Sequence, residues 1–250
     1  MHAPTVAKAE KAPPSQARPL AVSEIFGPTV QGEGPSLGRC CSFLRLGGCN
    51  LHCSWCDTAY TWDWTGRNGL RYDPRSELRT LSVDDVWSQL QRTNTRMLVV
   101  SGGEPLLQQQ GLVGLLVLAR DAGWRVELET AGTIMPTTAL CALVSQFNVS
   151  PKLAHSGNDR EKRYRPDVLD RLQATQRAVW KFVAQEPDDL DEIAELVEAH
   201  DLDPVYVMAE GTSAALLLRR TAKLADAVIA RGWNLTTRLH ILLWGARRGV

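Results

Sequence analysis

Residues 49–58, Cys-Asn-Leu-His-Cys-Ser-Trp-Cys-Asp-Thr, hold three cysteines, with three residues between Cys49 and Cys53 and two between Cys53 and Cys56. Only a short loop holds cysteines at this spacing, and thiolates that face one point make a site for a soft metal. A tetrahedral zinc site needs a fourth ligand, and no second CxxC follows. An iron–sulfur cluster usually takes four thiolates. The pattern therefore favours a cluster with one open iron, and a zinc knuckle or three unrelated cysteines is the alternative.

The sequence around this loop predicts a parallel α/β fold. Residues 40–46 form a predicted buried strand that ends at Gly47 and Gly48, so the cysteine loop follows its C-terminal end. Strand and helix patterns then alternate about six times, which implies parallel strands joined by crossover helices. The further strands are predicted at residues 96–101, 125–129, 147–150, 178–183, 205–209 and 235–244. The helices are predicted at residues 82–92, 106–122, 137–143, 165–174, 187–199 and 212–230, and a long loop or hairpin at residues 60–80.

Length and composition predict one soluble domain. The chain of 250 residues suffices for a single large α/β domain, which we assign to residues 19–250. Residues 1–18 have no apolar periodicity and are predicted to form a disordered tail. Lys plus Arg and Asp plus Glu both number 28, so no net charge attracts nucleic acid or membrane. The cysteine usage and the absence of a signal peptide predict a cytoplasmic protein with no membrane partner.

Polar residues follow the C-terminal ends of several predicted strands. One such residue is more often a helix cap, but several at one end of a parallel sheet predict a shared site. A glycine-rich loop at residues 30–34 permits close approach to a ligand, although composition alone favours an ordinary turn. Arg45 is either paired structurally or contacts a ligand, and His240 is either a core histidine or functional. Cys40, Cys41 and Cys141 are expected to be small core residues. The polar residues at the strand ends are Ser101, Glu104, Glu129, Thr130, Ser150, Lys152 and Glu210.

The cysteine loop resembles in full the CxxxCxxC motif of the radical S-adenosylmethionine (SAM) family. In that family, SAM chelates the open iron, and one electron from the cluster cleaves SAM to a 5′-deoxyadenosyl radical. Residues 101–105, Ser-Gly-Gly-Glu-Pro, resemble the element that contacts the amino group of SAM there. A Gly-Gly turn alone is weak evidence, but this turn follows the next strand after the cysteine loop, where the family has it.

Within that family, the chain resembles the 7-carboxy-7-deazaguanine synthases of the queuosine (7-deazapurine) pathway. The matching segments span the chain from residue 23 to the C-terminus. A departure is Met208-Ala209-Glu210-Gly211, where the family usually has proline in place of alanine. The matches are Ser-Glu-Ile-Phe 23–26, Gln-Gly-Glu-Gly 31–34, Phe-Leu-Arg-Leu 43–46, Gly-Cys-Asn-Leu 48–51, Trp-Cys-Asp-Thr 55–58, residues 101–105, Glu-Thr-Ala-Gly-Thr 129–133, Ser-Pro-Lys 150–152, Arg-Leu-His 238–240 and Leu-Trp 243–244.

The resemblance implies an abridged β/α barrel of about six parallel strands and a carbon–nitrogen lyase. This lyase converts 6-carboxy-5,6,7,8-tetrahydropterin to 7-carboxy-7-deazaguanine and ammonia, with SAM regenerated. The implied cofactors are a [4Fe–4S] cluster, SAM and Mg²⁺. The implied partners are the pterin, an electron donor such as flavodoxin, and a second copy in a homodimer.

The resemblance also implies the site residues, with no catalytic side chain beyond the cofactor-held radical. The implied cluster ligands are Cys49, Cys53 and Cys56, and Thr58 is the implied Mg²⁺ ligand. SAM would be lined by Trp55, Cys56, Asp57, Gly103, Ser150, Pro151 and Lys152. The pterin would be contacted by Val30, Gln31, Gly32, Arg45, Ser101 and Val250. The alternatives are a glycyl-radical activase, a deazapurine homologue in antibiotic biosynthesis, and a non-catalytic zinc-binding protein.

Overall fold

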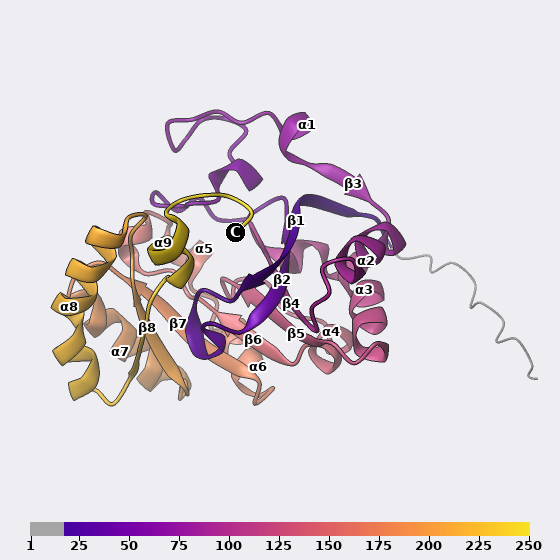
Figure 1. Ribbon diagram of the computed structural model, residues 1–250. Helices are drawn as coiled ribbons and strands as arrows, with labels where there is room; N and C mark the ends of the chain where they lie inside the picture. The colour runs from indigo at the N-terminus through magenta and orange to yellow at the C-terminus, as the bar shows by residue number, and fades with distance from the viewer. Residues whose placement is uncertain (1–17) are drawn as a thin grey trace, which may run out of the picture.

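A computed structural model describes residues 18–250, so the predicted tail at residues 1–18 lies outside the described residues except for Arg18. The strands form one sheet in the order β3-β1-β2-β4-β5-β6-β7-β8-β9, drawn in Figure 1. β1 pairs antiparallel with β2 and β3, and each pairing from β2 to β9 is parallel. β9 and β3 are the two edges, so the parallel part is the predicted abridged, open barrel.

The elements alternate along the chain as the sequence predicts. The strands are β1 (Leu20–Val30), β2 (Cys40–Leu46), β3 (Arg79–Leu81), β4 (Met97–Gly102), β5 (Arg125–Thr130), β6 (Gln146–Val149), β7 (Ala178–Ala184), β8 (Val205–Ala209) and β9 (Asn234–Thr236). The helices are α1 (Pro74–Glu77), α2 (Val83–Gln91), α3 (Gln109–Asp121), α4 (Thr138–Leu143), α5 (Arg160–Arg163), α6 (Pro166–Gln173), α7 (Asp189–His200), α8 (Ala214–Ala230) and α9 (Leu239–Trp244). Short 3₁₀ turns occupy Gly34–Ser36, Ala59–Thr61, Pro105–Gln108 and Ala154–Ser156.

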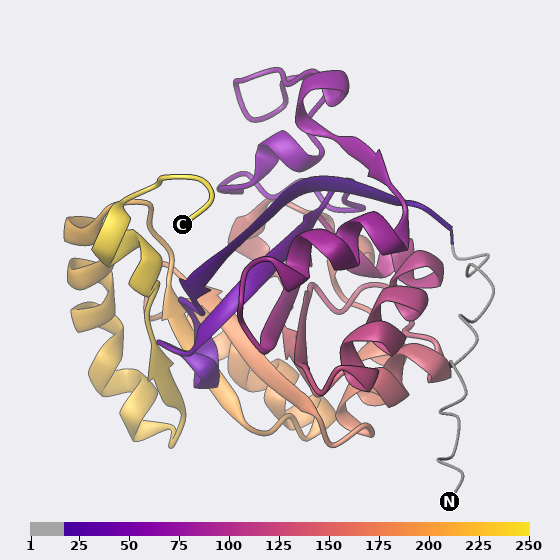
Figure 2. The same cartoon turned by 45° about the vertical axis from the view of Figure 1, so that its right-hand side comes forward.

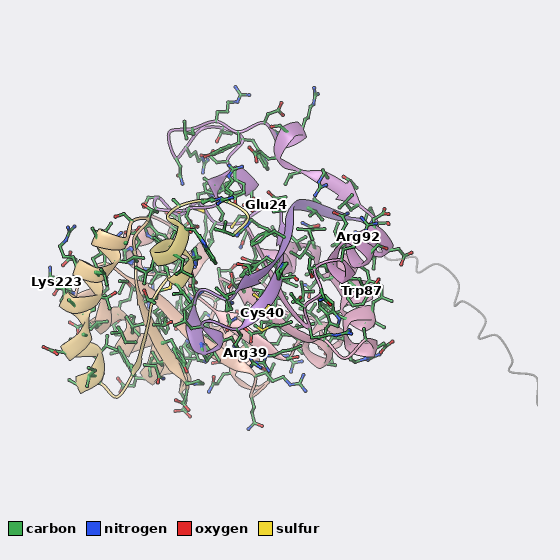
Figure 3. The ribbon with its side chains drawn as sticks, in the orientation of Figure 1. Glu24, Arg39, Cys40, Trp87, Arg92 and Lys223 are labelled. Carbon is green, nitrogen blue, oxygen red and sulfur yellow. The ribbon has the colours of Figure 1, made fainter. Side chains whose placement is uncertain are left out.

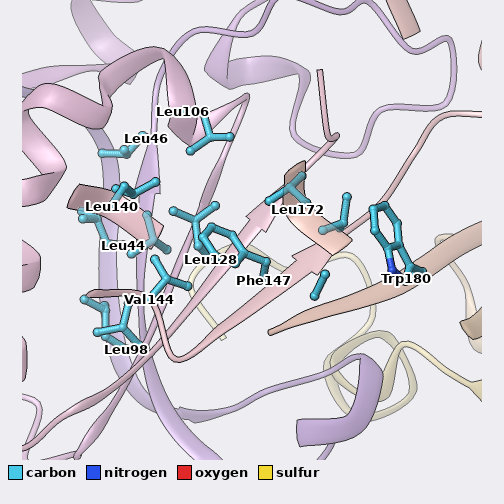
Figure 4. Packing of buried hydrophobic residues seen from close by; sticks show 14 of the residues in the cluster. Leu44, Leu46, Leu98, Leu106, Leu128, Leu140, Val144, Phe147, Leu172 and Trp180 are labelled. Atoms are coloured by element: carbon cyan, nitrogen blue, oxygen red, sulfur yellow. The ribbon is translucent and has the colours of Figure 1, made fainter. Parts of the chain in front are cut away.

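Side chains alternate between two faces along each parallel strand. In β2, Leu44 and Leu46 belong to the main apolar cluster with the helices, while Phe43 and Arg45 line the opposite side. The same alternation recurs in the other strands, because successive side chains of a strand point to opposite faces. Figure 4 shows the outward set packed together, from Leu98 across Phe147 to Trp180. The inward set is free to carry polar groups.

One end of the strands is covered by long connections. Residues 47–78 leave the sheet after β2 and rise above it, and the C-terminal segment after α9 curls towards them (Figures 1 and 2). The long helix α8 lies on the outside of the β8–β9 edge, where it contacts both strands. Among residues 18–250, no helix combines the length and apolar character that a bilayer span requires.

Two sequence expectations were wrong. Residues 235–244 were expected to form a strand, but β9 ends at Thr236 and Leu239–Trp244 is helix α9. A short apolar run does not distinguish a strand from a helix by its period, and here Ile241 is buried while Leu243 and Trp244 are exposed. Cys40 is exposed rather than a core residue, because it begins β2 and faces away from the cluster that buries Cys41. Cys41 and Cys141 are buried as expected.

Two further segments are more ordered than their composition indicates. The apolar stretch before the glycine-rich loop is the eleven-residue strand β1, which pairs with β2 from Val22 to Val30. The segment 60–80 contains α1 and the short strand β3, which pairs with the start of β1 rather than with a neighbour in its own segment. Both differences come from pairing partners that lie outside the segment itself.

The outward apolar set should carry most of the folding free energy. Leu128 of β5 is 0% exposed and Leu218 of α8 is 63% exposed. We expect Leu128→Ala to lower the free energy of unfolding by about 2–5 kcal/mol, because it leaves a cavity in close-packed surroundings. Leu218→Ala is the matched control and should change it by less than about 0.5 kcal/mol. Urea unfolding followed by circular dichroism measures both, and equal losses would contradict the assignment of the core.

Candidate active site

One pocket of about 220 Å³ opens at the C-terminal ends of the parallel strands. Its walls come from the ends of β1, β2, β4, β5, β7 and β8, from the cysteine loop and from the C-terminal segment. Of the predicted site residues, Pro151 is the exception, and it is buried between two lining residues. The predicted residues that line the pocket are Val30, Gln31, Gly32, Arg45, Cys49, Cys53, Trp55, Cys56, Asp57, Thr58, Ser101, Gly103, Ser150, Lys152 and Val250. The structure thus brings the predicted set together.

The three cysteines of the loop are free thiols, and each sulfur receives one N–H hydrogen bond. The donors are the backbone N–H of Leu51 to Cys49 Sγ at 3.4 Å, Asn158 Nδ2 to Cys53 Sγ at 3.3 Å, and Trp62 Nε1 to Cys56 Sγ at 3.3 Å. Such donors stabilise negative charge on sulfur, so the set fits a cluster held by three thiolates. Among the described residues, no group of three or more His, Cys, Asp or Glu encloses a single ion. A cubane needs no such convergence, since each thiolate binds a different iron.

Burial favours the protonated thiols of Cys49 and Cys53. It raises the pKa of Cys49 to about 12, and burial is also the largest cause of the raised pKa of Cys53. Thiolate is the metal-binding form, so loading the site releases protons. Thr58 stands beside the loop, with its hydroxyl 3.6 Å from Cys56 Sγ.

The Gly102-Gly103 turn packs directly against the cysteine loop. A Cβ on Gly103 would lie 2.0 Å from the carbonyl oxygen of Gly48 and 3.0 Å from Cys49 Cβ, so only glycine fits. The following Glu104 is fully buried and accepts hydrogen bonds from Thr130 Oγ1 at 2.8 Å and from the Ala131 N–H at 2.8 Å. Glu104 therefore ties the ends of β4 and β5 together, and the glycines keep a narrow space beside the cysteines.

Trp55, Ser150 and Lys152 form one wall next to this turn. Lys152 Nζ donates to Ser150 O at 2.8 Å and to Ser150 Oγ at 3.0 Å, and it lies 5.8 Å from the centre of the Trp55 ring. Trp55 Nε1 donates to His155 Nδ1 at 3.0 Å. The wall thus offers an ammonium group, a hydroxyl and an aromatic face, all held in place by side-chain contacts.

Arg45 lines the same pocket as the cysteine loop, and in the described part of the chain only the Nε of its guanidinium is used in a hydrogen bond. Its Nε donates to Glu24 Oε2 at 2.8 Å, and Tyr60 OH donates to the same oxygen at 2.9 Å. Within residues 18–250, the terminal nitrogens of Arg45 have no hydrogen-bond partner. In Figure 3, Glu24, the partner of Arg45, lies beneath the connection formed by residues 47–78, and Cys40 lies towards the opposite end of the strands. A planar guanidinium edge that faces the pocket matches a carboxylate.

Ser101 and Gln31 share one carboxylate. Ser101 Oγ donates to Glu129 Oε2 at 2.7 Å, and Gln31 Nε2 donates to Glu129 Oε1 at 3.2 Å. Arg45 and Ser101 are partners in the β2–β4 register and Ser101 contacts Glu129 of β5, so these three form one row on the inward face, which Gln31 joins from the loop after β1. The row joins a cation, a hydroxyl, an amide and a carboxylate at the floor of the pocket.

A buried ionic network closes the other side of the pocket. Lys181 and Arg238 both pair with Glu33, with Arg238 Nε 3.2 Å from Glu33 Oε1, and Arg238 also pairs with Asp57. Burial alone would raise the pKa of Glu33, but the two cations outweigh it and hold that pKa well below its usual range. The network links the glycine-rich loop, β7, the cysteine loop and the start of α9.

His240 is part of the pocket wall rather than of the apolar core. Its Nδ1 lies 2.1 Å from the place where a Cβ on Gly32 would be, so Gly32 is required for the ring to pack there. Burial lowers the pKa of His240, which keeps the ring neutral at neutral pH. His240 thus lines the pocket and is not in the apolar cluster, and a functional role for it stays a prediction.

Sequence reasoning assigned no role to Lys181, Glu33 or Arg238. A usable signal existed for Lys181, because the run 178–184 is apolar apart from this one lysine. Strand alternation places Lys181 on the face opposite Trp180 and Phe182, which are in the apolar cluster. Its partner Glu33 lies 148 residues before it, and Arg238, the second cation that pairs with Glu33, lies 57 residues after it, so no local pattern connects the three.

Comparison with known proteins identifies the family that the chain resembles in sequence. Residues 30–166 match the family model described as "4Fe-4S single cluster domain". A 7-carboxy-7-deazaguanine synthase of Pyrobaculum aerophilum is 34% identical and covers 91% of this chain and 96% of its own length. The 7-carboxy-7-deazaguanine synthase of Bacillus subtilis is 32% identical and covers 94% of this chain and 100% of its own length. The crystal structure of QueE from Escherichia coli superposes with a TM-score of 0.67 at 24% identity, covering 89% of this chain and 95% of its own, and it supports the fold.

The buried network predicts a pH-dependent stability. We expect Lys181→Met to lower the free energy of unfolding at about pH 7 by about 3 kcal/mol, because it leaves Glu33 buried with one cation fewer. In the wild type the pKa of Glu33 is held below its ordinary 4.5, so its contribution is intact between about pH 7 and about pH 5 and is lost only at lower pH. In the variant, burial raises that pKa, and protonation relieves the penalty. The stability difference between the two proteins should therefore shrink between about pH 7 and about pH 4.

The matched control is Lys223→Met. The ion pair of Lys223 with Glu186 is exposed, with 55% and 52% of the two side chains accessible, so its loss should change the stability very little at any pH. Urea unfolding across the pH series measures both variants. A difference for Lys181→Met that grows as the pH falls would contradict the assigned network.

Proposed function

The chain belongs to the 7-carboxy-7-deazaguanine synthase family, and from this premise we propose that it converts 6-carboxy-5,6,7,8-tetrahydropterin to 7-carboxy-7-deazaguanine and ammonia. The observation that carries the proposal is that one pocket has three hydrogen-bonded cysteine sulfurs in one wall and the open guanidinium edge of Arg45 in another. A radical generator and a carboxylate site would then lie within one small enclosure. This is the arrangement that a radical rearrangement of a carboxylated substrate requires.

The cysteine loop and the adjacent walls fit the cofactors of the family. Cys49, Cys53 and Cys56 would hold three irons of a [4Fe–4S] cluster. The Gly103 turn and the wall of Trp55, with Ser150, Pro151 and Lys152, would hold SAM, and Asp57 would border it. Bound together, the cluster and SAM supply a carbon-centred radical at this end of the barrel. The protein's part is to hold SAM and substrate at a fixed separation and to exclude other hydrogen donors.

The floor of the pocket suits a pterin. Arg45 offers two N–H groups to the substrate carboxylate. Glu129 has used two acceptor sites, for Ser101 and Gln31, and a carboxylate has about four, so it retains capacity for the N–H groups of an aminopyrimidine edge. Val30 and Gly32 line the same pocket and would lie against the planar ring. Polar groups with fixed orientations discriminate a substrate more strongly than apolar walls do.

The C-terminal segment would cover the bound substrate. Val250 lines the pocket, and Arg248 holds the segment by stacking 3.4 Å from the centre of the Tyr60 ring and by an ion pair with Glu77 at 3.0 Å. Tyr60 also donates to Glu24, the partner of Arg45. The cover is therefore connected to the carboxylate site, and closing it would keep water from the reacting atoms.

Three parts of the proposal rest on the family resemblance alone. These are Mg²⁺ beside the Thr58 hydroxyl, a one-electron donor protein such as flavodoxin, and a homodimer. A hydroxyl is a suitable hard ligand for an ion that keeps water or substrate oxygens.

The deciding experiment is turnover of the reconstituted protein. With carboxytetrahydropterin, SAM and a reductant under anaerobic conditions, we expect 7-carboxy-7-deazaguanine to form. Cys53→Ala should abolish both the brown colour and turnover, because one cluster ligand is lost. Cys40→Ala is the matched control and should retain both, since Cys40 is exposed and lies outside the pocket lining. Iron, sulfide and product are measured for each variant.

Each other result has a definite meaning. A colourless zinc protein would leave a zinc-binding role. An iron–sulfur protein that cleaves SAM without forming the deazaguanine would favour the glycyl-radical activase or a homologue with another substrate. Retained iron–sulfur absorption in Cys53→Ala would remove Cys53 from the ligand set.

The role of Arg45 can be tested separately. We expect Arg45→Met to lower kcat/KM by roughly 10–100-fold, since a hydrogen bond to a charged group contributes about 1.5–3 kcal/mol. Binding of the carboxylated pterin should weaken by a similar factor, while binding of the pterin without the carboxylate should be unchanged. Equal weakening of the two ligands, measured by calorimetry, would show that Arg45 supports the pocket without contacting the carboxylate.

A further inference from the structure

Two side-chain N–H groups outside the CxxxCxxC motif donate to its sulfurs, in addition to the Thr58 hydroxyl that lies 3.6 Å from Cys56 Sγ. Asn158 Nδ2 lies 3.3 Å from Cys53 Sγ, and Trp62 Nε1 lies 3.3 Å from Cys56 Sγ. The third sulfur, of Cys49, receives a backbone N–H from its own loop. The motif thus supplies one N–H donor itself and takes two N–H donors from elsewhere in the chain.

Asn158 is held so that its amide points at the sulfur. Its Oδ1 accepts the backbone N–H of His52 at 2.8 Å, which fixes the orientation of the amide, and its Nδ2 is also 3.2 Å from Ser156 Oγ. Ser54 N–H donates to Ser156 O at 3.0 Å, so the segment that carries Asn158 is bonded to the cysteine loop on both sides of Cys53. The contact of Asn158 with sulfur is therefore built into the fold of the loop.

Trp62 is fixed by packing instead. It is buried, and its ring makes an edge contact with the His52 ring at 5.1 Å. The indole N–H has one available direction in this position, and Cys56 Sγ accepts it. Both sulfurs border the apolar cluster of Leu51, Cys53 and Ala131, where electrostatic interactions are less screened than in water.

We propose that Asn158 and Trp62 are positioning residues that raise the reduction potential of the cluster through their N–H···S hydrogen bonds. Reduction adds one electron from an external reductant, with no bond or proton moved, so the cluster and its thiolates become more negative by one charge. An N–H dipole whose positive end points at sulfur stabilises the more negative state. The two side chains thereby make the cluster easier to reduce.

The proposal rests on the proposed function only in that the protein must hold the cluster. The test is the midpoint potential of the reconstituted full-length protein, measured by titration with dithionite and mediator dyes and read from the electron paramagnetic resonance signal of the reduced cluster. Trp62→Phe keeps the ring and removes the N–H, and Asn158→Leu removes the amide at similar size and charge. Each should shift the potential to more negative values, and the double variant should shift it further, since the bonds reach different sulfurs.

The chain offers a matched control for each variant. Trp64→Phe removes another indole two residues away that makes no bond to sulfur, and Asn68→Leu removes an amide whose Nδ2 donates to the backbone oxygen of Cys53 at 2.9 Å. Asn68→Leu therefore loosens the same loop without touching a thiolate. Both controls should leave the potential at the wild-type value.

The outcomes separate this proposal from the proposed function. A wild type that holds no iron and sulfide would overturn the cluster and this proposal with it. A normal cluster whose potential moves equally in the variants and their controls, or moves to more positive values, would overturn this proposal alone. If Asn158→Leu loses the cluster, the potential of Trp62→Phe tests the proposal. Loss of the cluster from both variants would overturn it, because these residues would then be needed to form the site rather than to set its potential.

Discussion

The two-residue alternation of parallel strands is the constraint from which the rest of the structure follows. It divides each strand into an outward set that packs with the helices and an inward set that is spared from the apolar core. Arg45, Ser101, Glu129 and Lys181 can be adjacent inside the barrel only because Leu44, Val100, Leu128 and Trp180 point the other way. The polar pocket and the apolar core are two faces of one sheet.

A buried polar face must satisfy its own charges, and this requirement ties distant parts of the chain together. Lys181 is 6% exposed, and an unpaired ammonium there would be strongly destabilised. Its partner Glu33 comes from the loop after β1, and Arg238 joins Glu33 to Asp57 in the cysteine loop. The ionic network thus fixes the glycine-rich loop and the cysteine loop relative to the sheet. Residues on these loops can then keep constant distances from those on the strands.

The sequence alone predicted correctly those features that depend on residues close together in the chain. The spacing of the cysteines, the Gly-Gly turn after β4 and most strands and helices depend on near neighbours, and the structure has them at the expected residues. Features that depend on distant partners were missed. Glu33, Lys181 and Arg238 form one network across 205 residues, and Asn158 reaches Cys53 from 105 residues away. Helix α9 was mistaken for a strand because a six-residue segment with five apolar residues fits either period.

Contacts between distant parts of the chain also hold the two segments at the mouth of the pocket, which are the connection after the cysteine loop and the C-terminal segment. Arg248 stacks on Tyr60, Tyr60 bonds to Glu24, and Glu24 orients Arg45. Because Tyr60 lies in the connection that follows the cysteine loop, one series of contacts joins the C-terminal cover, the cysteine loop and the proposed carboxylate site. A ligand carboxylate bound to the free edge of Arg45 would weaken the ion pair between Arg45 and Glu24. The change would reach both the connection that carries Tyr60 and the C-terminal segment. Glu24 and Tyr60 thus connect the proposed carboxylate site to the contacts that hold the C-terminal segment.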